Sequence, residues 1–235
     1  MRKKIFVSYL KILVMVSVII FFILSLFKFI FNANYFNIEY IITPDKDMNL
    51  GYLKGKNIFK LNLESIFNKI KNEFSHYRIL RISIQLPNRL IVKADPRKAC
   101  AYLRLYRDFA IDFDGIVFEA QQFNPELPII FGLERKIGYV KPGQKLEIKG
   151  LKLALKLIKE FNKAEQLKKY KIRRINIDTG FGLAFFMDNI EVKIDERIDE
   201  NLKLLIMLIS QLEHDLNRIS YIDLRFKDPV IKYER

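Results

Sequence analysis

Residues 1–31 read MRKKIFVSYLKILVMVSVIIFFILSLFKFIF, and this stretch decides how the chain is organised. The 16 residues from Ile12 to Phe27 carry no charge. A helix that crosses the hydrocarbon core of a bilayer needs about 20 apolar residues, and lysines near its ends extend their amines to the interface. Lys11 and Lys28 would lie about 25 Å apart on such a helix, at about 1.5 Å per residue. We therefore predict a transmembrane helix over residues 12–31, with Lys11 and Lys28 as its interface anchors in the membrane lipid.

A cleaved signal peptide is the main alternative for this stretch. Signal peptides have an apolar region of about 7–15 residues, followed by small residues at the cleavage site. Here the apolar run is longer and continues into FIFNANYFN, with phenylalanine where small residues are needed. A buried core helix is disfavoured by the length and the terminal position of the run. The sequence favours a retained anchor.

The charges around the span predict its orientation. Arg2, Lys3 and Lys4 precede it, whereas the twenty residues after Lys28 are close to neutral. The positive-inside rule therefore places residues 1–11 in the cytoplasm and everything after the span on the other side. We predict a single-pass type II protein of the cell (inner or cytoplasmic) membrane, with its ectodomain in the periplasm or outside.

The composition excludes several classes of function. The chain has 41 Lys plus Arg against 27 Asp plus Glu, a formal net charge of +14. Because the ectodomain lies away from the chromosome, we predict no nucleic-acid partner and interpret the basic cluster at 168–174 as the solvated end of a helix. The single cysteine, Cys100, excludes an internal disulfide and a Cys-rich zinc site.

The sequence contains few residues whose type and spacing would suit a catalytic site. His76 and His214 are the only histidines, and Asp112-x-Asp114-Gly115 lacks the other ligands of a calcium loop, so we interpret it as a hairpin turn. We predict no catalytic residue, no cofactor and no metal site, and hence no enzyme. An extracytoplasmic hydrolase would need a pair of carboxylates in a cleft, which the sequence alone leaves open.

Two patterned blocks follow the span and predict an α+β fold. In the first, residues 35–95, apolar residues alternate with polar ones or recur with helical spacing, and Leu80, Ile82, Ile84 and Leu86 share one strand face. Its predicted elements are a strand over 36–42, a helical turn within 47–55, a helix over 63–74 capped by Asn62, and strands over 80–86 and 90–94.

The second block, residues 96–235, predicts a mixed β-sheet domain with two amphipathic helices. Its predicted elements are strands over 99–105, 109–112 and 115–118, a buried stretch over 127–132, a helix over 151–161, a meander over 175–194, a helix capped by Asp199 that extends to Leu216, and strands over 221–226 and 230–233.

The last two strands are the candidate binding site. Alternation in residues 221–226 directs Ile222, Leu224 and Phe226 to the core and the other three side chains away from it. A terminal strand is often an edge strand, whose free N–H and C=O groups accept a partner's strand. A paired, purely structural strand is the alternative. The predicted partner-binding residues are Tyr221, Asp223, Arg225, Val230, Ile231, Tyr233 and Lys232, the last of which also guards the edge against promiscuous pairing.

The order of several short motifs resembles the FtsQ/DivIB family of bacterial cell-division proteins. The resemblance covers nearly the whole chain and rests on these segments: FNIEYI at 36–41, GKNIFKLN at 55–62, LPNRLIV at 86–92, IDFDGIVF at 111–118, LPIIFG at 127–132 and YIDLRF at 221–226.

The resemblance implies a POTRA-like βααββ domain over 35–95, which serves recruitment, and a β domain over 96–235. It further implies a non-enzymatic scaffold at the division site that links cytoplasmic and extracytoplasmic division proteins and controls septal wall synthesis. FtsB- and FtsL-like proteins would bind the C-terminal edge by adding a strand. A POTRA-type chaperone-like module in outer-membrane assembly or secretion is the alternative.

Overall fold

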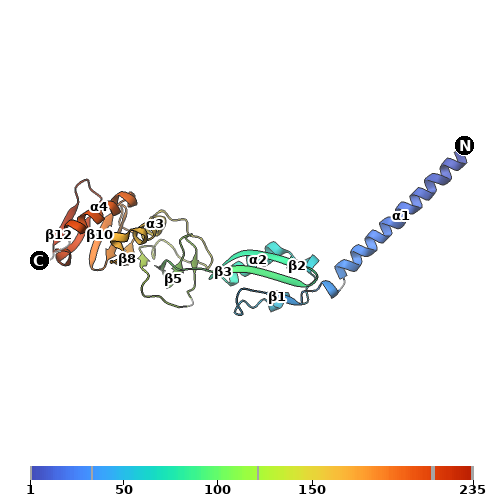
Figure 1. The fold of residues 1–235 in the computed structure, drawn as a ribbon, viewed down its shortest axis with the longest axis horizontal. Coiled ribbons are helices and arrows are strands. Elements are labelled where there is room, and N and C mark those ends of the chain that lie inside the picture. Colours follow the sequence, from blue (N-terminus) through green and yellow to red (C-terminus); the bar gives the residue numbers. More distant parts are fainter. Residues whose placement is uncertain (1, 33, 121, 213–214, 234–235) are drawn as a thin grey trace. The chain divides into compact units, whose positions relative to one another are not determined.

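The computed structural model describes residues 2–32, 34–120, 122–212 and 215–233, which form a mixed α+β structure (Figure 1). The chain forms two compact units, the first of which includes the N-terminal helix. Met1–Lys71 and Arg78–Asp95 form the first unit, and Asn72–Tyr77 and Pro96–Arg235 form the second.

Helix α1, Arg2–Asn32, contains the apolar run. Its stretch Lys11–Phe29 is, within the described residues, the one helix long and apolar enough to cross a membrane, and none of this stretch is buried against the protein. Nineteen residues at about 1.5 Å each span about 28 Å, close to the thickness of a bilayer's hydrocarbon core.

The first unit contains a three-stranded sheet of order β1-β3-β2, with β1 at Tyr40–Ile42, β2 at Tyr77–Gln85 and β3 at Arg89–Pro96. Helix α2, Leu63–Glu73, begins where predicted, because Oδ1 of Asn62 accepts a hydrogen bond from the Ser65 amide at 2.9 Å. The predicted face of this helix holds its buried residues, Ile66 and Ile70.

The structure differs from two expectations for this unit. The first strand, expected over 36–42, is shorter, since Asn34–Phe36 forms a 3-10 turn before it. The helical turn expected within 47–55 is confirmed as the 3-10 turn Gly51–Leu53, but the first α-helix of the βααββ order is replaced by this turn and a second one, Ile58–Lys60. Asn49 and Asn57 accept the amides of Gly51 and Phe59 and so favour turns. Leu80 within β2 and Leu86 just after it are exposed.

The second unit is built on one nine-stranded sheet with the order β12-β11-β10-β9-β8-β7-β4-β5-β6. Strands β4 and β5 pair antiparallel, β7 lies parallel between β4 and β8, and β10 and β11 are parallel neighbours. The strands are β4 Ala101–Arg104, β5 Asp108–Ile111, β6 Val117–Phe118, β7 Ile129–Phe131, β8 Ile172–Asn176, β9 Leu183–Met187, β10 Ile190–Ile194, β11 Ile219–Asp223 and β12 Val230–Tyr233.

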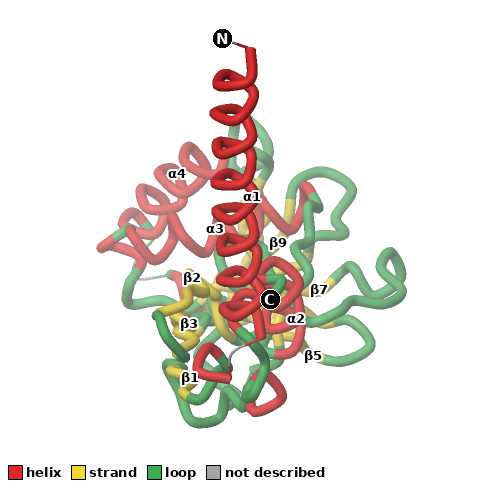
Figure 2. The backbone as a smooth tube through the Cα atoms, turned by 90° about the vertical axis from the view of Figure 1, so that its right-hand side faces the viewer, coloured by secondary structure: helices red, strands yellow, loops and turns green. Residues whose placement is uncertain are grey.

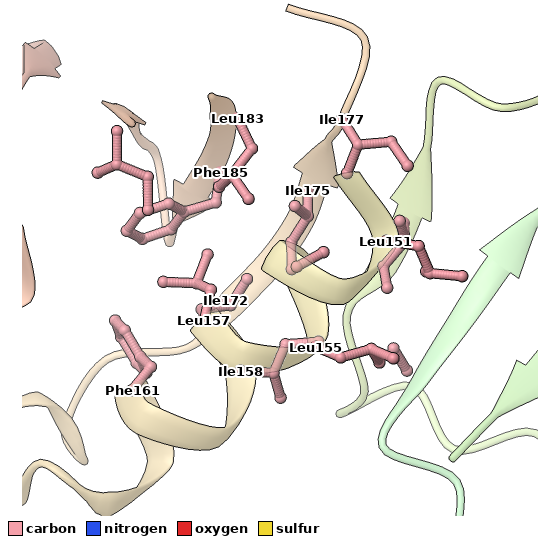
Figure 3. Close-up of a cluster of buried hydrophobic side chains, with 14 of the residues drawn as sticks. Leu151, Leu155, Leu157, Ile158, Phe161, Ile172, Ile175, Ile177, Leu183 and Phe185 are labelled. Atoms are coloured by element: carbon pink, nitrogen blue, oxygen red, sulfur yellow. The ribbon is translucent and has the colours of Figure 1, made fainter. Parts of the chain in front are cut away.

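Two amphipathic helices, α3 (Lys149–Lys163) and α4 (Ile198–Gln211), pack against each other and share one core with the sheet (Figure 2). Figure 3 shows the α3 part of this core, where Leu157 and Phe161 meet Phe185 of β9. Because α4 connects β10 to its parallel neighbour β11, it also positions the C-terminal strands.

The structure corrects three details of the second unit. Phe226, expected in the core, is 57% exposed, because β11 ends at Asp223 and the chain then leaves the sheet. Asp199 does not cap α4, since it lies within the first turn and pairs with Lys156. Leu216 belongs to a separate 3-10 turn, Leu216–Arg218, and not to the helix.

Candidate protein-binding edge

Strands β11 and β12 form the C-terminal end of the large sheet. They pair antiparallel, with Tyr221 opposite Lys232 and Ile222 opposite Ile231. The register shifts between Ile219 and Tyr221, which makes Ser220 the extra residue of a β-bulge. Such bulges are common at sheet edges, where they increase the local twist.

The backbone of β12 offers hydrogen-bonding groups to the outside. The Ser220 hydroxyl donates to the Lys232 carbonyl at 3.1 Å, so that this carbonyl is directed toward β11. In an antiparallel ladder one residue directs both its N–H and its C=O to the same neighbour, and the next residue directs them to the opposite side. Ile231 and Tyr233 therefore direct their backbone groups to the outer side of β12, where the sheet order ends among the described strands.

The side chains of this edge divide between the two faces of the sheet. Ile231 is half-buried and packs against the core beneath α4, opposite the fully buried Ile222. On the outer face, the register aligns Glu191, Tyr221 and Lys232 in one row across three strands. This outer row, together with the exposed Val230, mixes charge, an aromatic ring and apolar surface.

Tyr221 is held in place by a cation. The Lys193 amine lies 4.8 Å from the centre of its ring, within the usual range of a cation–π interaction. The Lys193 carbonyl also accepts the Leu224 amide at 2.8 Å, so the same residue fixes the end of β11. Lys193 and Ser220 carry no sequence signal for this site, because only the pairing of β10, β11 and β12 brings them to this edge.

Asp223 and Arg225 form a bidentate ion pair at the end of β11. Arg225 donates from Nη2 to Oδ2 at 2.6 Å and from Nε to Oδ1 at 2.9 Å, and its backbone amide adds a bond of 3.1 Å to Oδ1. The Asp223 side chain is only 3% exposed, and that of Arg225 is 25% exposed. Hydrogen bonds from Arg225 lower the pKa of Asp223, so the carboxylate stays charged.

The predicted binding residues therefore occupy three different environments. Asp223 is buried within its ion pair, whereas Tyr221, Arg225 and Ile231 are half-buried and Val230, Lys232 and Tyr233 are exposed. All seven lie on β11, on β12 or just after β11.

Of the residues weighed for catalysis, Asp112 accepts the amides of Asp114 and Ile116, as expected for a turn, and His214 lies outside the described residues.

Across the described part of the chain, no group of three or more His, Cys, Asp or Glu side chains is arranged to hold a metal ion. Cys100 is buried, and its thiol donates to the Ile111 carbonyl at 3.3 Å. Asp112 and Cys100 therefore have structural partners. The ring of His76 packs 4.6 Å from that of Tyr77, with Nε2 buried and without a hydrogen-bond partner among the described residues. The open edge of β12 is the candidate binding site.

The architecture defines a class of protein, in which an N-terminal apolar helix able to span a membrane is followed by a three-stranded and a nine-stranded sheet with their helices. Residues 101–225, more than half of the chain, match the family model of the C-terminal part of the cell division protein FtsQ/DivIB. The chain therefore belongs to the FtsQ/DivIB family. This membership makes it a cell-division protein, and α1 agrees with a single-pass membrane protein.

Two relatives extend the match beyond the second unit. The cell division protein FtsQ of Geotalea daltonii is 27% identical over 190 residues, which cover 77% of this chain and 66% of the relative. The cell division protein FtsQ of Syntrophotalea carbinolica is 26% identical over 211 residues, covering 83% and 73%. The matched part thus spans just under two thirds of the first relative and more than two thirds of the second.

Proposed function

We propose that this protein is a division-site scaffold that captures an extended segment of a partner on the outer side of β12. The observation that carries this proposal is the position of β12 at the end of the nine-stranded sheet, with the backbone groups of Ile231 and Tyr233 directed outward. A partner strand added there would gain main-chain hydrogen bonds, and the exposed Val230 and Lys232 would select its side chains.

FtsB- and FtsL-like division proteins are the proposed partners, by family likeness. In this function α1 anchors the protein in the cytoplasmic membrane as a type II protein, with residues 1–11 inside and the chain from residue 35 onward outside. Residues 35–95 act as a POTRA-like recruitment domain, and residues 96–235 bind the partners. The scaffold links division proteins on both sides of the membrane and controls septal wall synthesis through contacts, without chemistry of its own.

Ile231→Pro tests the strand-addition mode. Proline removes the outward N–H and leaves the β11 ladder intact, because the Ile231 amide does not face β11. A main-chain hydrogen bond contributes about 1 kcal/mol, and the proline ring also obstructs the incoming strand, so we expect at least about a tenfold weaker affinity for an FtsB-like partner. The measurement is co-purification and titration of the full chain in detergent with that partner.

Ile231→Ala is the matched control, because it removes the same core contact but retains the N–H. We expect Ile231→Ala to bind nearly as well as the original protein, and both variants to show the original circular dichroism spectrum. Equal binding by Ile231→Pro and the original protein, with both folded, would exclude strand addition on this side of β12.

A further inference from the structure

The end of the first unit nearest the membrane carries exposed aromatic side chains. Tyr35 follows the last residue of α1, Asn32, by three positions, and an extended chain covers at most about 3.6 Å per residue. Tyr35 therefore lies within about 11 Å of the end of α1. Its ring is 69% exposed and lies edge-on to Phe36, with 5.4 Å between the ring centres.

Contacts within the unit bring a distant segment to the same place. The ring of Phe36 lies 5.2 Å from that of Phe59, which is 41% exposed. The backbone supports this contact, because the Ile38 amide donates to the Lys56 carbonyl at 2.9 Å and Gly55 donates back to Ile38 at 2.9 Å. Phe59 thus lies close to the residues that directly follow α1, although it is itself more than twenty residues further along the chain.

The segment that carries Phe59 is basic. Residues 48–63 contain three exposed lysines, Lys54, Lys56 and Lys60, and no acidic residue. Asp47 and Glu64 flank this segment, and the facing residues 34–42 contain one acid, Glu39, which accepts a hydrogen bond from the Asn88 side-chain amide at 2.8 Å. We call the set Tyr35, Phe36, Lys54, Lys56, Phe59 and Lys60 the membrane-proximal surface.

Aromatic rings and lysines on one surface match the chemistry of a lipid interface. Tyrosine and other amphipathic rings concentrate at the headgroup level of membranes, and lysines close to a membrane are attracted to anionic lipid phosphates. The short tether from α1 holds this surface at a high local concentration next to one leaflet, so weak contacts with each headgroup suffice.

We propose that the membrane-proximal surface docks on anionic phospholipid headgroups of the leaflet from which the ectodomain emerges. This inference rests on the membrane span of the proposed function. Docking would fix the first unit against the bilayer, instead of leaving it on a free tether, and would hold this end of its sheet at the membrane.

The absence of tryptophan from the chain allows a direct test. Phe59→Trp places a single fluorophore on the proposed surface of the full chain, which is then reconstituted into phosphatidylcholine vesicles with or without phosphatidylglycerol. Lipids brominated near the headgroup report contact. Leu80→Trp is the matched control. Leu80 is 53% exposed and lies in the same unit, on β2. It is five residues, or about 17 Å, from the Gln85 end of β2, which is the end near the membrane-proximal surface.

With phosphatidylglycerol present, we expect quenching of Phe59→Trp to exceed that of Leu80→Trp by at least about fivefold, because only the membrane-proximal surface would reach the brominated lipids. Changing Lys54 and Lys56 to glutamine in the Phe59→Trp protein should abolish the gain that phosphatidylglycerol produces. Equal quenching at both positions, or the same quenching with and without anionic lipid, would overturn the proposal.

Alkaline extraction separates this proposal from the one on which it rests. If the protein resists carbonate extraction but the Phe59→Trp fluorescence stays unquenched, the docking proposal is overturned and the transmembrane span is retained. A protein released by carbonate would overturn the span itself, and docking with it.

Discussion

Arg97 is a nearly buried cation that donates three hydrogen bonds. Its side chain is 6% exposed, and Nη1 donates to Oδ2 of Asp112, itself 11% exposed, at 2.6 Å. Nε donates to the Ser75 carbonyl at 3.1 Å, and the Arg97 backbone amide donates to the His76 carbonyl at 2.8 Å. This cluster ties the chain after α2 to the turn that follows β5, and residues 72–77 belong to the same compact unit as Asp112.

Arg97→Ala should therefore destabilise the second unit by about 3 kcal/mol, because the Asp112 carboxylate would remain buried without its cation. Lys136→Ala is the control, since the Lys136–Asp178 pair is more than half exposed at both ends and is worth less than about 1 kcal/mol. Urea unfolding followed by circular dichroism measures both values. Equal effects of the two substitutions would contradict the role given to burial.

Cys100 is expected to be chemically inert in the folded protein. Burial, reinforced by the Asp112 carboxylate, raises the pKa of its thiol to about 12, whereas an unfolded cysteine has a pKa of about 8.5. At pH 8 its reaction with a disulfide reagent should be slower in the native protein than in urea by on the order of a thousandfold. Because the folded pKa is raised, the thiol also makes the fold less stable as the pH rises above about 8.5.

At the level of elements, helices were easier to predict than the burial of strands. The spacing of Ile66 and Ile70, and of Leu151 and Phe161, identified the buried faces of α2 and α3, because a helix shows its own periodicity locally. Alternation also located β2, but it did not reveal that Leu80 is exposed. Which face of a strand is covered depends on elements far away in the sequence.

The turn between β8 and β9 requires glycine because of its backbone geometry. Gly180 and Gly182 both have a positive φ, +75° and +74°. A Cβ at Gly182 would lie 1.9 Å from the Ile194 carbonyl oxygen of β10, whereas a Cβ at Gly180 would meet nothing within 4 Å. The second glycine is therefore needed for close approach as well as for its conformation.

Alanine at these two positions should separate the two requirements. Gly180→Ala should cost about 1–2 kcal/mol, the price of a left-handed alanine. Gly182→Ala should cost at least about 3 kcal/mol, because β9 and β10 must also move apart. Thermal unfolding of the two variants measures the difference, and equal losses would show that the contact with Ile194 is not limiting.

At the scale of the whole molecule, the sequence analysis predicted the α+β class and the terminal strand over residues 230–233. It did not predict the strand order, in which β7 is inserted between β4 and β8, because parallel pairing across long connections leaves no local pattern. The burial of Asp223 was missed for a related reason. Its ion pair with Arg225 satisfies the carboxylate at a position where alternation indicates a solvent-facing side chain.

In the proposed function, residues 35–95 serve recruitment and residues 96–235 bind the partner. A shortened chain tests whether these two functions are separate. A protein that ends at Asp228 lacks β12 but retains α1, the first unit and the core beneath α4. As an N-terminal fluorescent fusion in cells depleted of the original protein, it should still form a midcell band, because recruitment is assigned to the first unit. It should nevertheless fail to restore division, so that the cells grow as filaments.

Lys227→Ala serves as the comparison for this deletion, because it changes an exposed side chain in the turn before β12 and leaves β12 with the outward backbone groups of Ile231 and Tyr233 in place. Cells that carry it should divide, because the edge that accepts the partner strand is unchanged. Normal division with the shortened chain would remove β12 from the mechanism. Loss of the midcell band would instead mean that localisation depends on the same edge, so that capture of the partner and recruitment could not be assigned to separate units.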